Sequence, residues 1–158
     1  MMYADVVVVG RCRPIPQHAV EEAERQLGVR FPHGYREYII RFGEGVLGGS
    51  FIRIYPPQRI VCDLVEWRAR IEEYWFWDQG AAVLAKEQAL ECIVFADTIN
   101  GDEIVFHPNA PDEIFVLPRD SGGIFAIGPG VPSAIEWCCS SGILTERFDE
   151  LVFEPRRE

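Results

Sequence analysis

The sequence predicts an α+β fold, in which a central, mostly antiparallel sheet (a β-meander) is surrounded by N-terminal and flanking helices. Two observations lead to this prediction. Apolar residues recur at helical spacing through the first half of the chain, and from Ile93 onward the period changes to two. The chain has 158 residues and shows no internal repeat, low-complexity segment or linker, so we expect one domain covering residues 1–158.

Two helices are predicted near the start of the chain. The first runs from Ile15 to Gly28, with a proline at its start, acidic residues in its early turns and a glycine just past its end. The second covers about Pro32 to Phe42, and Gly43 supplies its stop. The glycine-rich stretch from Glu44 to Gly49 is expected to be a loop.

The third predicted helix, about Ile60 to Asp78, is rich in tryptophan. Apolar residues at spacings of three and four are expected to face the core, and they are Ile60, Leu64, Trp67, Ile71 and Trp75. Trp77 falls on a different stripe, with Glu66, Arg70 and Glu73, and is therefore expected to lie away from the main core face. Neighbouring Phe76 is a further candidate for such a position. A short helix around Ala85 to Leu90 and a last one from Pro132 to about Ser140 complete the helices.

Turn residues fill each gap between the four apolar runs that follow Ile93, which predicts the meander. The first gap holds Asn100-Gly101, a strong short-range hairpin signal. The four runs are Ile93–Ala96, Ile104–Phe106, Ile114–Leu117 and Ile124–Ile127. Further strands are predicted at the valine run Val6–Val9, at Phe51–Tyr55 and near Leu151–Phe153.

The acidic balance of the chain limits its partners. A net charge of −10 opposes binding to nucleic-acid phosphates and to acidic membrane surfaces, but it allows a basic protein partner. The same charge can also serve solubility alone. No apolar run reaches the ~18 residues of a membrane span, and the valine run lacks the flanks of a signal peptide, so we expect a cytoplasmic protein. The oligomeric state stays open.

The five cysteines show no metal-ligand spacing and no C-x-x-C, which fits reduced thiols in a cytosol. Cys62 and Cys92 sit near apolar stretches, where cysteine usually behaves as a small hydrophobe. The histidines His18, His33 and His107 are scattered, without HxxxH or HxH spacing. Neither a metal site nor a cofactor is predicted, and no phosphate-cradling glycine motif or serine elbow occurs. A Cys–His nucleophile pair distant in sequence stays open.

Acidic residues gather around the first predicted hairpin, where Asp97, Asp102 and Glu103 could be taken for general acid/base carboxylates or a magnesium site. We prefer a structural interpretation. Asp97 can accept hydrogen bonds from loop amides, and Asp102 follows the hairpin glycine, where short polar side chains are favoured. No catalytic residue is therefore predicted.

Two blocks of residues have a distinctive order. The first joins Ile15 and the acidic run Glu21–Glu24 to Leu27-Gly28, and the segment Phe31–Tyr38 follows. The second joins Phe95-Ala96-Asp97 through a turn to Gly101-Asp102-Glu103 and a further strand. Together these blocks resemble the SUKH superfamily, which includes bacterial toxin-immunity proteins and the fungal Smi/Knr-type cell-wall regulators.

This resemblance implies a Smi/Knr-like α+β domain with a non-enzymatic immunity or scaffold role. An immunity protein of this kind binds and neutralises a cognate toxin, often a nuclease. The sequence departs from the pattern at Gly43-Glu44-Gly45, where relatives often carry asparagine-glycine, and the tryptophan-rich third helix belongs to no shared motif. Since function diverges within a fold, the identity of the partner does not follow from it.

Partner-binding residues are predicted chiefly on the third helix. Trp77 with Glu66 and Glu73 combines an aromatic anchor with acidic neighbours, the composition expected of an interface with a basic protein. Glu44 in the glycine loop is a further candidate. The alternative is that Trp77 packs under the following loop and the glutamates form a solvated helix face.

The leading hypothesis is an immunity-type protein that occludes the active site of a basic, nuclease-like toxin domain. A general scaffold that binds cellular proteins is the first alternative. A small hydrolase that uses Asp97, Asp102 or a cysteine is the second.

Overall fold

The computed structural model describes residues 2–49, 51–148 and 150–157, and over these ranges it confirms the α+β class. Eight strands form one sheet in the order β1-β8-β2-β3-β4-β5-β6-β7, and only the β1–β8 pair is parallel. The elements follow the chain as β1 Val7–Val8, α1 Gln17–Leu27, α2 Tyr35–Phe42, β2 Gly45–Leu47, β3 Ile52–Ile54, α3 Pro57–Glu73, η1 Asp78–Gly80, α4 Lys86–Ala89, β4 Ile93–Thr98, β5 Glu103–His107, β6 Ala110–Leu117, β7 Phe125–Ala126, α5 Gly130–Ser140 and β8 Val152–Pro155.

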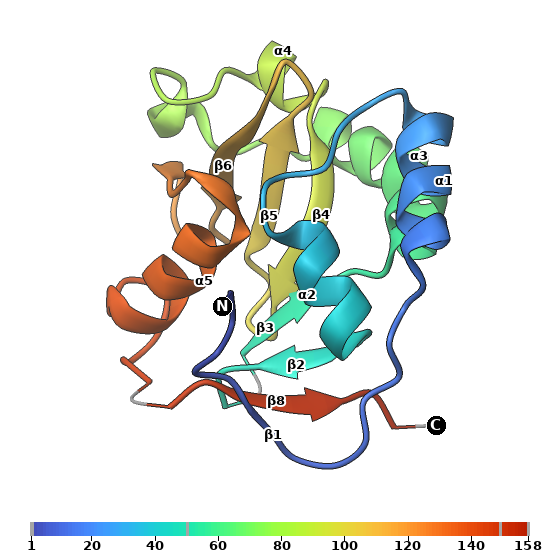
Figure 1. Ribbon diagram of the computed structural model, residues 1–158. Coiled ribbons are helices and arrows are strands. Elements are labelled where there is room, and N and C mark those ends of the chain that lie inside the picture. Colours follow the sequence, from blue (N-terminus) through green and yellow to red (C-terminus); the bar gives the residue numbers. More distant parts are fainter. Residues whose placement is uncertain (1, 50, 149, 158) are drawn as a thin grey trace.

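The predicted meander is confirmed as β4 to β7, in which each strand pairs antiparallel with the next (Figure 1). The first hairpin turns at Gly101, whose φ of +96° is a conformation that favours glycine. Asp102 closes this turn, because its carboxylate accepts hydrogen bonds from the Thr98 hydroxyl at 2.7 Å and from the Arg119 amide at 2.9 Å. The structural role predicted for Asp102 is thus confirmed.

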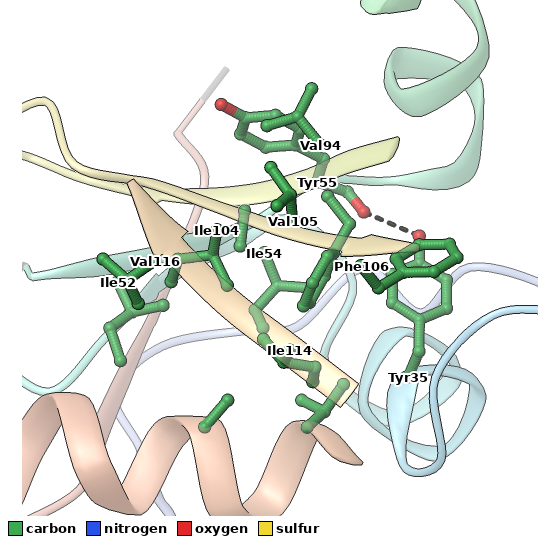
Figure 2. Packing of buried hydrophobic residues seen from close by; sticks show 14 of the residues in the cluster. Tyr35, Ile52, Ile54, Tyr55, Val94, Ile104, Val105, Phe106, Ile114 and Val116 are labelled. Carbon is green, nitrogen blue, oxygen red and sulfur yellow. Dashed lines mark hydrogen bonds between the residues drawn. The ribbon is translucent and has the colours of Figure 1, made fainter. Parts of the chain in front are cut away.

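Helices cover the two faces of the sheet unequally. On one face, α2 and α5 pack over the apolar side chains of the central strands, and Ile104 and Val116 lie on that side in Figure 2. On the other face, Val94 and Val105 lie towards α3, which α1 flanks in turn (Figures 1 and 2). α3 packs over β4, and among the described residues no helix covers the part of this face that belongs to β8, β2 and β3.

The valine run forms β1 at one edge of the sheet, and it pairs with β8 of the same chain, Val7 opposite Val152. The valine run therefore pairs with a strand of its own chain. The amide of Val7 donates to the carbonyl of Leu151, just before β8, and the amide of Val9 donates to that of Phe153, so the backbone of Val8 faces the open edge. No helix among the described residues has the length and apolar character needed to cross a membrane.

Two predicted boundaries are wrong. The third helix ends at Glu73, not near Asp78, because the chain turns at Tyr74 and carries Trp77 back onto the protein. The expected loop after Gly43 contains strand β2, which pairs with both β3 and β8. Gly45 is needed there for close packing, since a Cβ atom would come within 2.4 Å of the Glu154 carbonyl oxygen and 2.5 Å of the Phe153 ring.

Candidate partner-binding surface

Trp77, the predicted aromatic anchor, is buried. Only 3% of the residue is exposed, and its indole Nε1 donates a hydrogen bond to the Pro118 carbonyl at 2.7 Å. The expectation that Trp77 lies away from the core is therefore wrong. The physical reason is the early end of α3, which takes Trp77 off the helical stripe and turns it under the segment before β7. Burial of an indole requires a partner for its N–H, and a backbone carbonyl supplies it.

Glu66 and Glu73 lie where the sequence placed them, on the solvent-exposed side of α3. Helical geometry puts Val65 on this side as well, opposite the stripe that faces the core. Val65 is 79% exposed, and beyond the helix end Tyr74 and Phe76 are 65% and 47% exposed. We call Val65, Glu66, Glu73, Tyr74 and Phe76 the α3 face. It combines exposed apolar side chains with two carboxylates.

The two glutamates of the α3 face carry uncompensated charge. Neither forms an ion pair with any residue in the described ranges. The arginines of α3 are engaged elsewhere: Arg68 donates to the Cys92 carbonyl, Arg70 to Glu103 and Arg59 to Asp63. The α3 face therefore presents negative charge that no neighbouring arginine neutralises.

Glu44 does not belong to the α3 face. It lies beside β2, forms an ion pair with Arg156, and lines an open groove of about 620 Å³ on the helix-free part of the sheet. The structure thus brings together two of the four predicted residues, Glu66 and Glu73. It buries Trp77 and places Glu44 in a separate, arginine-lined groove.

The carboxylates near the first hairpin are bound by structural partners. Asp97 lies within β4 and accepts two hydrogen bonds from Arg53, at 2.7 and 2.9 Å, and one from the Tyr55 hydroxyl at 2.9 Å. The expectation that Asp97 accepts from loop amides is wrong, because the strand extends one residue past it. Glu103 accepts from the Trp67 indole and from Arg70.

The five thiols differ in burial, and Cys12 is partly buried. Cys92, Cys138 and Cys139 are buried, and burial raises the pKa of the Cys92 thiol to about 12 and that of Cys139 to about 11. Burial likewise raises the pKa of the Cys138 thiol. A raised pKa keeps a thiol protonated, which makes it a weak nucleophile. Cys62 is exposed, so its expected role as a small hydrophobe in the core is wrong.

Metal-ligating side chains do not converge in the part of the chain that the structure describes. Within it, no three His, Cys, Asp or Glu residues lie in an arrangement that could hold a metal ion. His18 and His33 are exposed on different elements, and His107 lies 3.7 Å from Glu91 at the end of β5.

Comparison with known families identifies the family to which the chain belongs. The sequence pattern of the SMI1 / KNR4 family (SUKH-1) matches residues 14–136, which is most of the chain and includes both blocks singled out above. The chain belongs to the SMI1 / KNR4 family. No curated protein matches it.

Membership of the SMI1 / KNR4 family supports a non-catalytic immunity or regulatory module. The match ends at residue 136, within α5, so β8 lies beyond it. β8 pairs with both β1 and β2 and thereby builds the helix-free part of the sheet. Part of that surface is consequently formed by residues outside the family match, whereas β2 and β3 lie within it.

Sequence reasoning missed Val65 and Tyr74 of the α3 face. A signal for Val65 was present, because Val65 is an apolar residue on the side of α3 opposite the buried stripe. Tyr74 gave no such signal, since its exposure depends on where α3 ends. Phe76, the further candidate beside Trp77, is exposed as expected, whereas Trp77 is buried.

Proposed function

We propose that this protein is a non-catalytic immunity module that binds a basic toxin domain through the α3 face and blocks it by occlusion. The observation that carries the proposal is the exposure of Val65, Tyr74 and Phe76 beside the unpaired carboxylates of Glu66 and Glu73. Exposed aromatic side chains bury much area at small entropic cost, so they serve well as interface anchors. Unpaired carboxylates attract a basic partner over longer distances.

Family membership supports the non-catalytic part of this proposal. The engagement of Asp97, Asp102 and Glu103 by structural partners, and the burial of three thiols, support it further. Occlusion requires no covalent chemistry, only complementarity of shape and charge. A nuclease is a fitting target, because proteins that bind nucleic acid are themselves basic.

The test is affinity capture from the native lysate, read out by quantitative mass spectrometry. The bait is the wild-type chain or the double variant Glu66→Lys/Glu73→Lys. The matched control is Glu136→Lys/Glu146→Lys, which makes the same charge change at exposed glutamates outside the α3 face. We expect the wild type and the control to retain a basic toxin domain that the α3 variant loses.

Two results would contradict the proposal. Equal retention of the toxin by the α3 variant would place the interface elsewhere. Retention of abundant cellular proteins without any toxin would instead favour a general scaffold. Direct inhibition completes the test, since the recovered toxin domain must lose its activity when the wild-type chain is added at equal concentration.

A further inference from the structure

The helix-free part of the sheet carries a groove whose charged side chains are mainly arginines, three of which are ion-paired with Asp97, Asp63 and Glu44. The groove has a volume of about 620 Å³ and lies over β8, β2 and β3, beside the first turn of α3. Its described lining includes four arginines and two glutamates, in a chain of net charge −10. These charged side chains are Arg53, Arg59, Arg156, Arg157, Glu44 and Glu154.

The guanidinium group of Arg53 is oriented by the carboxylate of Asp97. Its Nε and one Nη donate to the two oxygens of Asp97 at 2.7 and 2.9 Å, and the Asp97 side chain is only 12% exposed. A guanidinium has five N–H donors in a fixed fork, so a bidentate pair through Nε and one Nη leaves the other Nη free to donate. The Arg53 side chain remains 42% exposed, which allows those donors to reach a ligand in the groove.

Arg59 is fixed against the same site. Its guanidinium carbon lies 3.7 Å from the centroid of the Tyr55 ring, and the Tyr55 hydroxyl donates to Asp97 at 2.9 Å. Figure 2 places the Tyr55 ring on the same side of the sheet as Val94 and Val105, the side that bears the groove. Stacking on the ring and a hydrogen bond to Asp63 orient Arg59, whose side chain is 38% exposed.

We propose that this groove binds an acidic segment of a partner protein, and that Arg53 and Arg59 contact its carboxylates. Two arginines whose orientation is fixed by Asp97 and Tyr55 lose little entropy on binding, and arginine matches a carboxylate through two parallel hydrogen bonds. Val46 and Tyr55 also line the groove and offer apolar contact to a peptide. The proposal does not rest on the α3 face, whose charge has the opposite sign.

A protein segment fits the groove better than a nucleic acid does. Glu44 and Glu154 lie in the lining, and the net charge of the chain is strongly negative, so a polyphosphate backbone would be repelled along most of its length. A short carboxylate-bearing peptide can place its charges on Arg53 and Arg59 and avoid the glutamates.

The experiment is fluorescence anisotropy with a fluorescein-labelled octapeptide of alternating glutamate and valine. A second octapeptide, with lysine in place of each glutamate, is the charge control. We expect saturable binding of the glutamate peptide, no binding of the lysine peptide, and a Kd at least about tenfold weaker for Arg59→Gln, because a charge-assisted hydrogen bond is lost. The matched variant Arg25→Gln removes an exposed arginine of α1 and should bind as the wild type does.

Arg53→Gln should weaken binding by a similar factor. Because this change leaves Asp97 without its arginine, Arg53→Lys is measured beside it, with folding of each variant checked by circular dichroism. The proposal is overturned if the wild type gives no saturable binding, if Arg25→Gln weakens binding as much as Arg59→Gln, or if a single-stranded oligonucleotide binds more tightly than the glutamate peptide.

Discussion

The α3 face and the arginine-lined groove hold their charges in opposite ways. Glu66 and Glu73 on the α3 face form no ion pair with the described residues, and their side chains stand in solvent. In the groove, Arg53 is bound by Asp97 and Arg59 rests on Tyr55. Unpaired, solvated charges act at long range and affect the rate of association, whereas oriented guanidinium groups act at short range and select geometry. One chain thus carries a surface suited to attraction and another suited to directional recognition.

The largest expected effect concerns the buried residue Trp77, which follows the α3 face in the sequence, and not the exposed residues of the face. Trp77→Ala removes a buried indole and leaves the Pro118 carbonyl without its donor, so we expect a loss of about 3–5 kcal/mol in the free energy of unfolding. Urea denaturation at neutral pH measures it. Val65→Ala is the comparison, because a side chain exposed at 79% should change stability by less than about 0.5 kcal/mol. Equal losses for the two variants would mean that Trp77 is not part of the core.

The second effect tests how the groove holds its arginines. Asp97→Asn keeps the shape but removes the charge that two Arg53 donors and the Tyr55 hydroxyl require, and we expect a loss of about 2 kcal/mol. The partial exposure of Arg53 limits the cost, because water can solvate its guanidinium. Urea denaturation gives the free energy, and peptide anisotropy on the same variant gives the affinity. A variant as stable as the wild type would show that the pair does not contribute.

The third effect concerns the pH dependence of stability that is due to Cys92, a buried residue of the hydrophobic core. Burial raises the pKa of the Cys92 thiol from 9.0 to about 12, so the folded protein holds this proton more tightly than the unfolded chain does. The contribution of the protonated Cys92 thiol to the free energy of unfolding is fully present below pH 9. It is lost as the pH rises from 9 towards 12, at about 1.4 kcal/mol per pH unit.

The measurement is urea denaturation of the wild type and of Cys92→Ala at pH 7, 9 and 10. Cys92→Ala should lose stability less steeply above pH 9, whatever its stability at pH 7. Identical slopes for the two proteins would contradict the assignment. Cys62→Ser serves as the control, since it removes an exposed thiol outside the core.

How far the sequence predicts the structure depends on whether local pattern or tertiary contact decides an element. The meander and helices α1 and α2 follow from periodicity and turn chemistry alone, and they were predicted within a few residues. The end of α3 was not, because Trp75 continues the helical apolar spacing that the structure abandons at Tyr74. The end of α3 depends on the burial of Trp77 against the Pro118 carbonyl. Since Pro118 is distant in the sequence, the residues around Trp77 do not predict this contact.

Residues around the groove likewise depend on tertiary contacts that the local sequence does not predict. Gly45 suggested a flexible loop, yet it is a strand residue that keeps β2 close to β8, a contact across more than a hundred residues. Asp97 was placed by its neighbours in the sequence, whereas its true partners, Arg53 and Tyr55, lie on β3 and just after it. Of the four residues predicted to bind a partner, Glu66 and Glu73 are exposed as expected, because helical spacing alone puts them in solvent.

The smallest expected effect separates the α3 face from the fold. Glu66→Lys/Glu73→Lys should change the free energy of unfolding by no more than about 0.5 kcal/mol per site, because both side chains are exposed and form no ion pair with the described residues. Urea denaturation beside the wild type checks this. A larger loss would mean that these glutamates stabilise the protein, and the double variant could then not be used to map binding.

The most direct test of the proposed function is the affinity of the captured toxin domain, measured by calorimetry at low and high salt for the wild type and for Glu66→Lys/Glu73→Lys. We expect the wild type to bind more weakly as salt rises, since its carboxylates are screened. We expect the variant to bind at least about tenfold more weakly at low salt, with a smaller dependence on salt. Equal affinity and equal salt dependence for the two proteins would contradict the placement of the interface on the α3 face.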